Sequence, residues 1–482
     1  MAGMAVDMED EEATDEGEEE YEDERAISRR RFLKWGLLAA GVTGAAALGG
    51  GILTGVIKIG GGSGLNPWET SAGVVDYSRV PETIDTSELR VAQWYDYWPG
   101  RFITNFEAYI RQKYNRTVDV VVDIYTSNEE VFTWVTQSGR KFDIMFPTNY
   151  MAQIMDRAGL LANVNEDWLP NLPNLADGVK TAGNGQTLGD FLTPQGTPYA
   201  FRANGSRYCV PYQWGTTGIA YNTNVFTEAD IRGLGWDVFG RSSWGGTTLT
   251  DRMGMLDDMR EVLGVGMKAA GWEAQVAAGL TPTGIPSNPA APYNGAYQWT
   301  ENEVEETKVN AARDAILAYK PNLLGFNTQN QGPNVRDGVT YAQHGWSGDI
   351  IYAIQPYSQT AYPVDYIIPK QGTARWVDNA VVHRESKNLW LVHEFINFFL
   401  DVVQGTVITD WNLYATPNIE SYDALAVYPA GCTPGTCHYD PKEDTRIYPT
   451  PSDLALCDYQ RDVGVDATQR QYIPAWNDIK FG

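Results

Sequence analysis

Acidic and aromatic side chains recur in this chain at positions that suit cation binding. Asp258 and Glu261 are three residues apart and share a face if their segment is helical. Carboxylates pair with ammonium groups and aromatic faces attract cations, but paired carboxylates also serve as general acid and base. Taken alone, the two acids also suit a solvated helix face, Trp346 and Trp376 suit a buried core, and Asp378 suits a helix cap.

Alternating strands and helices are expected to position these groups. The pattern predicts strands at 89–94, 118–125 and 142–146, and helices at 102–114, at 150–158, at 311–319, at 391–399 and from a cap at Asn128 through Trp134. Such alternation predicts an α/β fold whose parallel sheet carries helices on both faces. Ligands of such sheets bind beyond the carboxyl ends of the strands. The segments Trp94–Trp98 and Pro147–Tyr150 fall there.

The N-terminal region predicts export. Ser28–Lys34 (SRRRFLK) followed by apolar residues to Ile59 has the pattern of a twin-arginine signal, which moves folded proteins out of a prokaryotic cytoplasm. The segment 29–59 is long enough to span a bilayer, so it is either cleaved or retained as a membrane anchor. We expect a disordered acidic tail at 1–28 and a linker at 60–87.

The charge balance excludes one class of partner. The chain of 482 residues has 61 acidic against 36 basic residues and a formal net charge of -25. Nucleic-acid binding depends on Lys and Arg, so we expect no nucleic-acid partner. An acidic surface suits high salt and predicts a halophilic archaeal source. The sequence has no P-loop, G-x-G-x-x-G, G-x-S-x-G or HExxH motif, which argues against a nucleotide enzyme and for no cofactor.

Four cysteines are expected to form disulfides in an exported protein. Cys432 and Cys437 flank a Pro-Gly turn and predict a tight loop, which leaves Cys209 and Cys457 for a long-range bond. His438 beside that loop raises a zinc alternative, but the four histidines have no metal-site spacing, so we expect no metal.

Read in order, ten segments from about Leu89 to Gly464 resemble the periplasmic polyamine-binding proteins, the spermidine/putrescine receptors of ABC importers. The matching segments are Gln93–Tyr97, Phe142–Tyr150, Val210–Gly215, Leu256–Glu261, Phe326–Thr328, Gly345–Trp346, Ile368–Lys370, Trp376–Asp378, Tyr414–Asn418 and Tyr459–Gly464. Each segment alone is a weak signal, and their shared order carries the resemblance.

The resemblance implies a bilobal clamp of two α/β lobes with ligand in the cleft between them. It implies crossings near Trp214–Asn222, near Trp376–Asp378 and after Asn418. Lobe 1 would contain residues 88–215 and 378–420, and lobe 2 would contain 216–377 and 421–482.

The resemblance also implies the site. Asp258, Glu261 and Asp378 become partners of ammonium groups, and Asp96 adds a carboxylate. The aromatic box is Trp94, Tyr97, Tyr150, Trp346, Trp376 and Tyr414, and the polar contacts are Thr148, Thr328 and Gln460. Because an unpaired buried carboxylate is costly, we expect an empty cleft to stay open and wet.

Some residues depart from the family pattern. Tyr95 stands where the family has a small hydroxyl residue, which predicts a shorter cleft, and Asn149 alters its motif. Insertions fall at about 180–208 and 272–302, and the loop at 430–440 is added.

Three functions follow as hypotheses. The first is an extracytoplasmic receptor, expected to be a monomer, that delivers a polyamine to an ABC permease. The second is a membrane-anchored sensor with the same clamp, which neighbouring permease genes would distinguish. The third is an exported hydrolase that uses the carboxylates, which a turnover assay would reveal.

Overall fold

The computed structural model describes residues 67–70, 73–175, 200–279, 299–354, 362–425 and 440–482, with the backbone of two short strands, β4 (Thr181–Ala182) and β5 (Gln186–Thr187). The acidic tail, the export segment and the Cys432–Cys437 pair lie outside these residues. Within them, no single helix is long and apolar enough to cross a membrane. One bent pair of helices, α11 (Leu389–Phe399) with α12 (Val402–Asn412), is long and apolar enough when the two are taken together.

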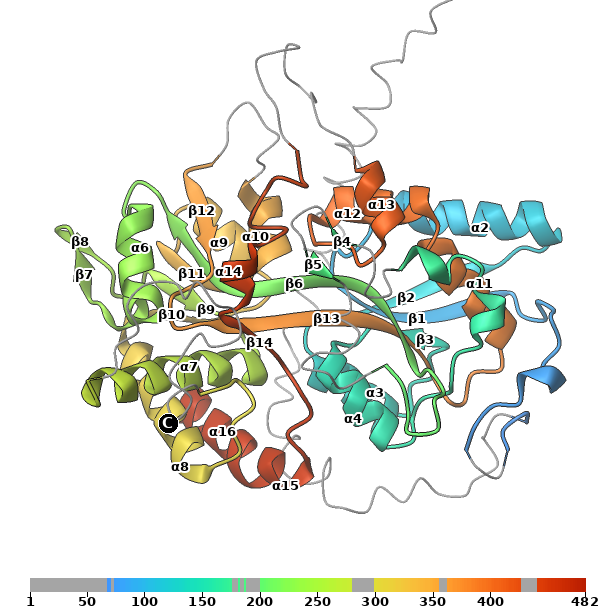
Figure 1. Cartoon of the computed structure of the whole chain (residues 1–482), viewed down its shortest axis with the longest axis horizontal. Coiled ribbons are helices and arrows are strands. Elements are labelled where there is room, and N and C mark those ends of the chain that lie inside the picture. The colour runs from blue at the N-terminus through green and yellow to red at the C-terminus, as the bar shows by residue number, and fades with distance from the viewer. Residues whose placement is uncertain are drawn as a thin grey trace, which may run out of the picture.

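A ten-stranded mixed sheet forms the centre of the molecule. Its order is β10-β9-β11-β6-β13-β3-β1-β2, with β12 beside β6 and β14 beside β13. The two long central strands, β6 (Cys209–Asn222) and β13 (Thr373–Val382), pair antiparallel and run through the middle of the molecule (Figure 1). They join two α/β lobes, which we name the β1 lobe and the β9 lobe.

Each central strand serves both lobes. In β6, residues 209–216 pair with β13, whereas residues 217–222 pair with β11 (Ala342–Trp346) and β12 (Val364–Ile367) of the β9 lobe. In β13, Val381 and Val382 pair with β3 of the β1 lobe, and residues 373–375 pair with β14 (Cys457–Tyr459). The chain therefore passes between lobes within continuous hydrogen-bonded strands.

The β1 lobe contains parallel strands covered by helices on both sides. The strands are β1 (Glu88–Trp94), β2 (Asp119–Tyr125) and β3 (Ile144–Met145). Helix α2 (Gly100–Tyr114) and the later helices α11 (Leu389–Phe399), α12 (Val402–Asn412) and α13 (Ile419–Ala424) lie on one side, and α3 (Asn128–Thr136) and α4 (Asn149–Arg157) lie on the other (Figure 1).

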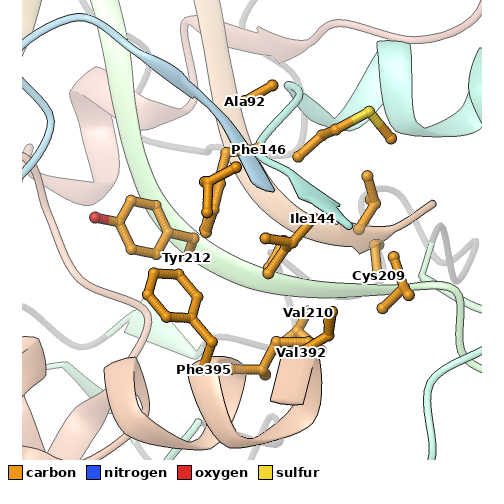
Figure 2. Close-up of a cluster of buried hydrophobic side chains, with 14 of the residues drawn as sticks. Ala92, Ile144, Phe146, Cys209, Val210, Tyr212, Val392 and Phe395 are labelled. Atoms are coloured by element: carbon orange, nitrogen blue, oxygen red, sulfur yellow. The ribbon is translucent and has the colours of Figure 1, made fainter. Parts of the chain in front are cut away.

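The core of the β1 lobe joins segments that are far apart in sequence. Figure 2 shows Ile144 and Phe146 from the β3 region against Tyr212 of β6 and Phe395 of α11. The ring of Phe395 also packs edge-on against Phe106 of α2 at 4.8 Å. Burying each such side chain contributes roughly 1.5–3 kcal/mol. Together these contacts hold α11 against α2 and against the β3 region.

The β9 lobe contains β9 (Met253–Met255), β10 (Leu323–Phe326), β11 and β12, beside the short hairpin β7 (Ser243–Trp244) and β8 (Thr247–Thr248). Its longest helix, α7 (Met259–Ala277), packs on α8 (Glu306–Tyr319), and the C-terminal α16 (Ile473–Phe481) packs on both (Figure 1). The remaining helices of this side are α6 (Glu228–Leu234), α9 (Gln331–Arg336), α10 (Ser347–Ile354), α14 (Pro451–Leu454) and α15 (Val465–Ala467).

The structure confirms the predicted strands and helices within a few residues and corrects two expectations. Helix α3 is capped by Ser127, whose hydroxyl accepts a hydrogen bond from the Glu130 amide at 3.2 Å, and not by Asn128. Cys209 and Cys457 are separate buried thiols. They pair with opposite ends of β13, Cys209 with Val381 and Cys457 with Thr373, so they are too far apart for a disulfide.

Candidate functional site

A cavity lies where the two lobes meet on the central strands. It encloses about 420 Å³, part of it open to solvent. Residues from both lobes line it, and they are aromatic or acidic for the most part: Trp94, Tyr95, Tyr97, Asn128, Thr148, Asp258, Glu261, Trp346, Asp349, Trp376, Asp378, Tyr414 and Gln460.

Strand ends position most of these side chains. Trp94 is the last residue of β1, Trp346 is the last of β11, and Gln460 directly follows β14. Thr148 and Asp258 stand at the N-caps of α4 and α7, the helices that follow β3 and β9. The cavity therefore forms where ligands of α/β sheets bind, at the carboxyl ends of the strands.

Asp378 projects from β13 into a network of neutral donors. Its two carboxylate oxygens accept hydrogen bonds from the Tyr97 hydroxyl at 2.6 Å and the Thr148 hydroxyl at 2.7 Å. Asn128 fixes Thr148 in turn, since its amide donates to Thr148 Oγ1 and its Oδ1 accepts from the Thr148 amide, both at 3.0 Å. Asp378 is thus held rigidly without a cationic partner in this network.

Asp258 and Glu261 both face the cavity from the first turn of α7. Asp258 Oδ1 caps the helix by accepting hydrogen bonds from the amides of Arg260 and Glu261, at 2.9 and 3.1 Å. Glu261 Oε1 accepts from Gln460 Nε2 at 3.2 Å. The predicted shared face is therefore present, with one of the two acids acting as the cap.

A fourth carboxylate, Asp349, was missed by the sequence analysis. It lies in the first turn of α10, and its Oδ2 accepts hydrogen bonds from the Tyr414 hydroxyl at 2.9 Å and from Gln331 Nε2 at 3.0 Å. The signal that could have found it is its position in the first helical turn after the strand that ends at Trp346, where ligands of α/β sheets bind.

The aromatic side chains form a continuous wall. Ring centroids lie 5.6 Å apart for Trp94 and Trp346, 6.5 Å for Trp346 and Trp376, and 5.2 Å for Trp376 and Tyr414, with edge-to-face geometry throughout. Glycines make room for two of these rings, because a Cβ on Gly215 would lie 2.8 Å from Trp376 and one on Gly348 would lie 2.5 Å from Tyr414.

Burial makes these carboxyl groups weak acids. It raises the pKa of Asp378 and of Asp349 to about 7, against the hydrogen bonds from Tyr97 and Tyr414 that lower them. Burial, and then the charge of Asp258, raises the pKa of Glu261 to about 8. Burial also raises the pKa of Asp258, opposed by the two amides that it caps. The cavity thus favours a ligand that brings positive charge.

The charged side chains that line the cavity are all acidic. In the part of the chain that the structure describes, no Lys or Arg lines this cavity. Arg260 lies behind the site, where its guanidinium stacks on the Tyr150 ring at 4.9 Å and donates to the Arg461 carbonyl at 2.8 Å. Among the described residues there is no cluster of His, Cys, Asp and Glu able to hold a metal ion.

Three predicted site residues do not line the cavity. Asp96 has a left-handed backbone, with φ of 51°, so the residues on either side of it line the cavity and Asp96 does not. The Tyr150 hydroxyl donates to Glu129 at 3.1 Å, outside the lining. Thr328 is buried and accepts a hydrogen bond from the Asp257 amide at 3.0 Å, which supports the loop before Asp258.

The acidic groups are more buried than the expected open, wet cleft would leave them, although the cavity is partly open to solvent. Asp258 and Asp378 are only 3% and 4% exposed. Backbone amides satisfy Asp258, which also feels the charge of Arg260, and hydroxyl groups satisfy Asp378, which has no cation among its hydrogen-bond partners. The elevated pKa values lower the cost of that burial, because a neutral carboxyl is easier to bury than a carboxylate.

The comparisons with known proteins agree with this architecture. The chain is 25% identical over 378 residues, 78% of its length and 84% of the relative's, to spermidine/putrescine-binding periplasmic protein 1 of Haemophilus influenzae. It is 26% identical over 333 residues, 69% of its length and 79% of the relative's, to the putrescine/cadaverine-binding protein of Pseudomonas aeruginosa.

Solved structures share the fold. The spermidine/putrescine ABC transporter substrate-binding protein PotD of Streptococcus pneumoniae matches with a TM-score of 0.57 at 20% identity, over 82% of this chain and 99% of that one. Residues 101–404 match the family model of the bacterial extracellular solute-binding proteins. The two-lobed fold, the cavity between its lobes and this match over more than half of the chain agree, and the protein belongs to the bacterial extracellular solute-binding protein family.

Proposed function

We propose that this solute-binding protein captures a polyamine in the inter-lobe cavity and delivers it to an ABC permease outside the cytoplasm. One observation carries the proposal: four carboxyl groups and six aromatic rings line one cavity that, among the described residues, has no cationic side chain. The names of the relatives from Haemophilus influenzae and Pseudomonas aeruginosa support the same ligand class.

A polyamine matches both features of the lining. Its ammonium groups would pair with Asp378 in β13 and with Asp258 and Glu261 on α7, as charge-assisted hydrogen bonds. Its methylene groups and charges would lie along Trp346 and Trp376, where each cation–π contact contributes about 0.5–2 kcal/mol. An anion or a neutral sugar would leave the acidic groups without charge compensation.

The proposed lobe division is 88–215 with 378–420, and 216–377 with 421–482, and the strand pairing supports its boundary near residue 216, whereas α13 places residues 421–424 with the β1 lobe. Thr216 is the last residue of β6 paired with β13, and Thr217 is the first paired with β11. Lobe motion would then bend β6 and β13 near the cavity. A ligand that contacts both lobes would favour their closure.

Export by the twin-arginine pathway, with 29–59 either cleaved or retained as a membrane anchor, a monomeric state and the absence of turnover also belong to this proposal. The extracellular family supports the site of action. The arginine-containing segment before the apolar run supports the route.

Calorimetric titration in high salt tests the ligand class. The whole chain should bind putrescine or spermidine one-to-one, without consuming it, and should not bind glycine betaine. Asp378→Asn should weaken binding by at least about 30-fold, because truncating one partner of a buried charge pair costs about 2–5 kcal/mol. Trp376→Ala should also weaken it.

A matched control distinguishes the loss of a carboxylate in the cavity from the loss of one negative charge elsewhere on the protein. Asp466→Asn removes a carboxylate that is 77% exposed and pairs with Arg470 on the surface of the β9 lobe, and should leave affinity unchanged. A folded wild-type protein that gives no heat with any polyamine would refute the proposed ligand.

A further inference from the structure

Tyr95 lines the cavity beside Asp349. It comes from the loop after β1, and its side chain meets Gln331 of α9 and Asp349 of α10, which belong to the β9 lobe. The ring therefore spans the boundary between the lobes. A residue with a small side chain at this position would leave the space of the ring to the cavity.

Hydrogen bonds hold the ring in place. Gln331 Nε2 donates to the Tyr95 hydroxyl at 3.2 Å and to Asp349 Oδ2 at 3.0 Å, while Gln331 Oε1 accepts from the Trp346 amide at 2.7 Å. The Tyr95 hydroxyl also donates to Asp349. Because Gln331 is tied to the backbone of β11, Tyr95 cannot turn away without breaking several bonds in a part-buried site.

The backbone reinforces this arrangement. The left-handed conformation of Asp96 directs both Tyr95 and Tyr97 to the cavity. Tyr97 reaches Asp378 at 2.6 Å, and Tyr95 reaches Asp349. Displacing Tyr95 would therefore also disturb the loop that holds Tyr97.

We infer that Tyr95 limits the length of the ligand, so that the cavity takes a short aliphatic diamine in preference to a triamine. The inference rests on the proposed function and narrows its substrate class. A longer amine would need the space of the Tyr95 ring, and moving that ring would remove a hydrogen-bond partner of Asp349 and Gln331 in a part-buried site. A short diamine would leave the Tyr95 ring in place and pair with the acidic groups on α7 and in β13.

Competitive titration of the whole chain with putrescine, cadaverine and spermidine tests the inference. The wild-type protein should bind a diamine more tightly than spermidine. Tyr95→Ser should shift the ratio of the dissociation constants toward spermidine by at least tenfold, whereas Tyr95→Phe, which keeps the ring, should retain the preference for diamines.

Two further variants guard against misfolding of Tyr95→Ser and against effects of losing a tyrosine outside the cavity. Tyr95→Leu removes the outer part of the ring but keeps apolar packing, so it should shift the ratio in the same direction if Tyr95→Ser fails to fold. Tyr362→Ser is the matched control, because Tyr362 is 39% exposed and outside the cavity lining, and it should leave the ratio unchanged.

The outcomes separate this inference from the proposed function. Polyamine binding with the same diamine-to-spermidine ratio in wild type, Tyr95→Ser and Tyr95→Leu would overturn the role of Tyr95 and leave the proposed function standing. No polyamine binding by folded wild type would overturn the proposed function, and the inference with it.

Discussion

Binding of a polyamine should release protons, because the cavity carboxyls are weak acids before they meet a cation. At pH 7, a pKa of about 7 leaves Asp349 and Asp378 each about half protonated, and a pKa of about 8 leaves Glu261 about nine-tenths protonated. If the ligand ionises all three, about two protons leave per ligand at pH 7. The same values predict that affinity rises about 20-fold from pH 7 to pH 8.

Calorimetry in two buffers of different ionisation enthalpy, at constant salt, measures this proton release directly. The observed enthalpy should differ between buffers by about two times the difference in their ionisation enthalpies at pH 7, and by much less at pH 9. Asp378→Asn removes one half-protonated group and should lower the release by about half a proton at pH 7. Equal enthalpies in both buffers, with an affinity that does not change with pH, would contradict the release of protons from the cavity carboxyls.

Stability without ligand should move in the opposite direction. A carboxyl with a raised pKa binds more protons in the folded chain than in the unfolded one between pH of about 4 and 8, so the free energy of unfolding falls as the pH rises through this window. The thermal midpoint of the ligand-free protein should therefore drop from about pH 5 to pH 8, while the increase produced by a polyamine grows. A midpoint that rises across this window would contradict the assigned pKa directions.

The remaining predictions concern the scaffold. Ser127→Ala removes the cap of α3 and should lower the free energy of unfolding by about 1 kcal/mol, measured by urea denaturation. Lys268→Met leaves Asp458 buried without its ion-pair partner and should cost about 3–5 kcal/mol in the same assay; a cost below 1 kcal/mol would show that the pair is not buried as described. Alkylation after unfolding without reductant should label both Cys209 and Cys457 in peptide mass spectra, and a linked peptide would disprove the separate thiols.

Local sequence patterns were sufficient for much of the framework. The alternation of apolar residues located β1, β2 and the helices α2 and α4, because strand and helix periodicity depend on neighbours in sequence. The helix cap was displaced by one residue, since Ser127 and Asn128 are both good caps and only the backbone conformation distinguishes them. The Cys209–Cys457 pairing failed because counting cysteines says nothing about their separation on a sheet.

The residue types at the strand ends, and with them the acidic and aromatic character of the site, follow from the order of amino acids alone. Which of these residues share the cavity depends on tertiary contacts. The tertiary structure excluded Asp96, whose own backbone is left-handed, and it added Asp349, which contacts Tyr95 from a segment more than 200 residues away in sequence. The physical reason is that β6 and β13 bring the two lobes together, and the order of strands in a sheet depends on long-range pairing that no local pattern contains.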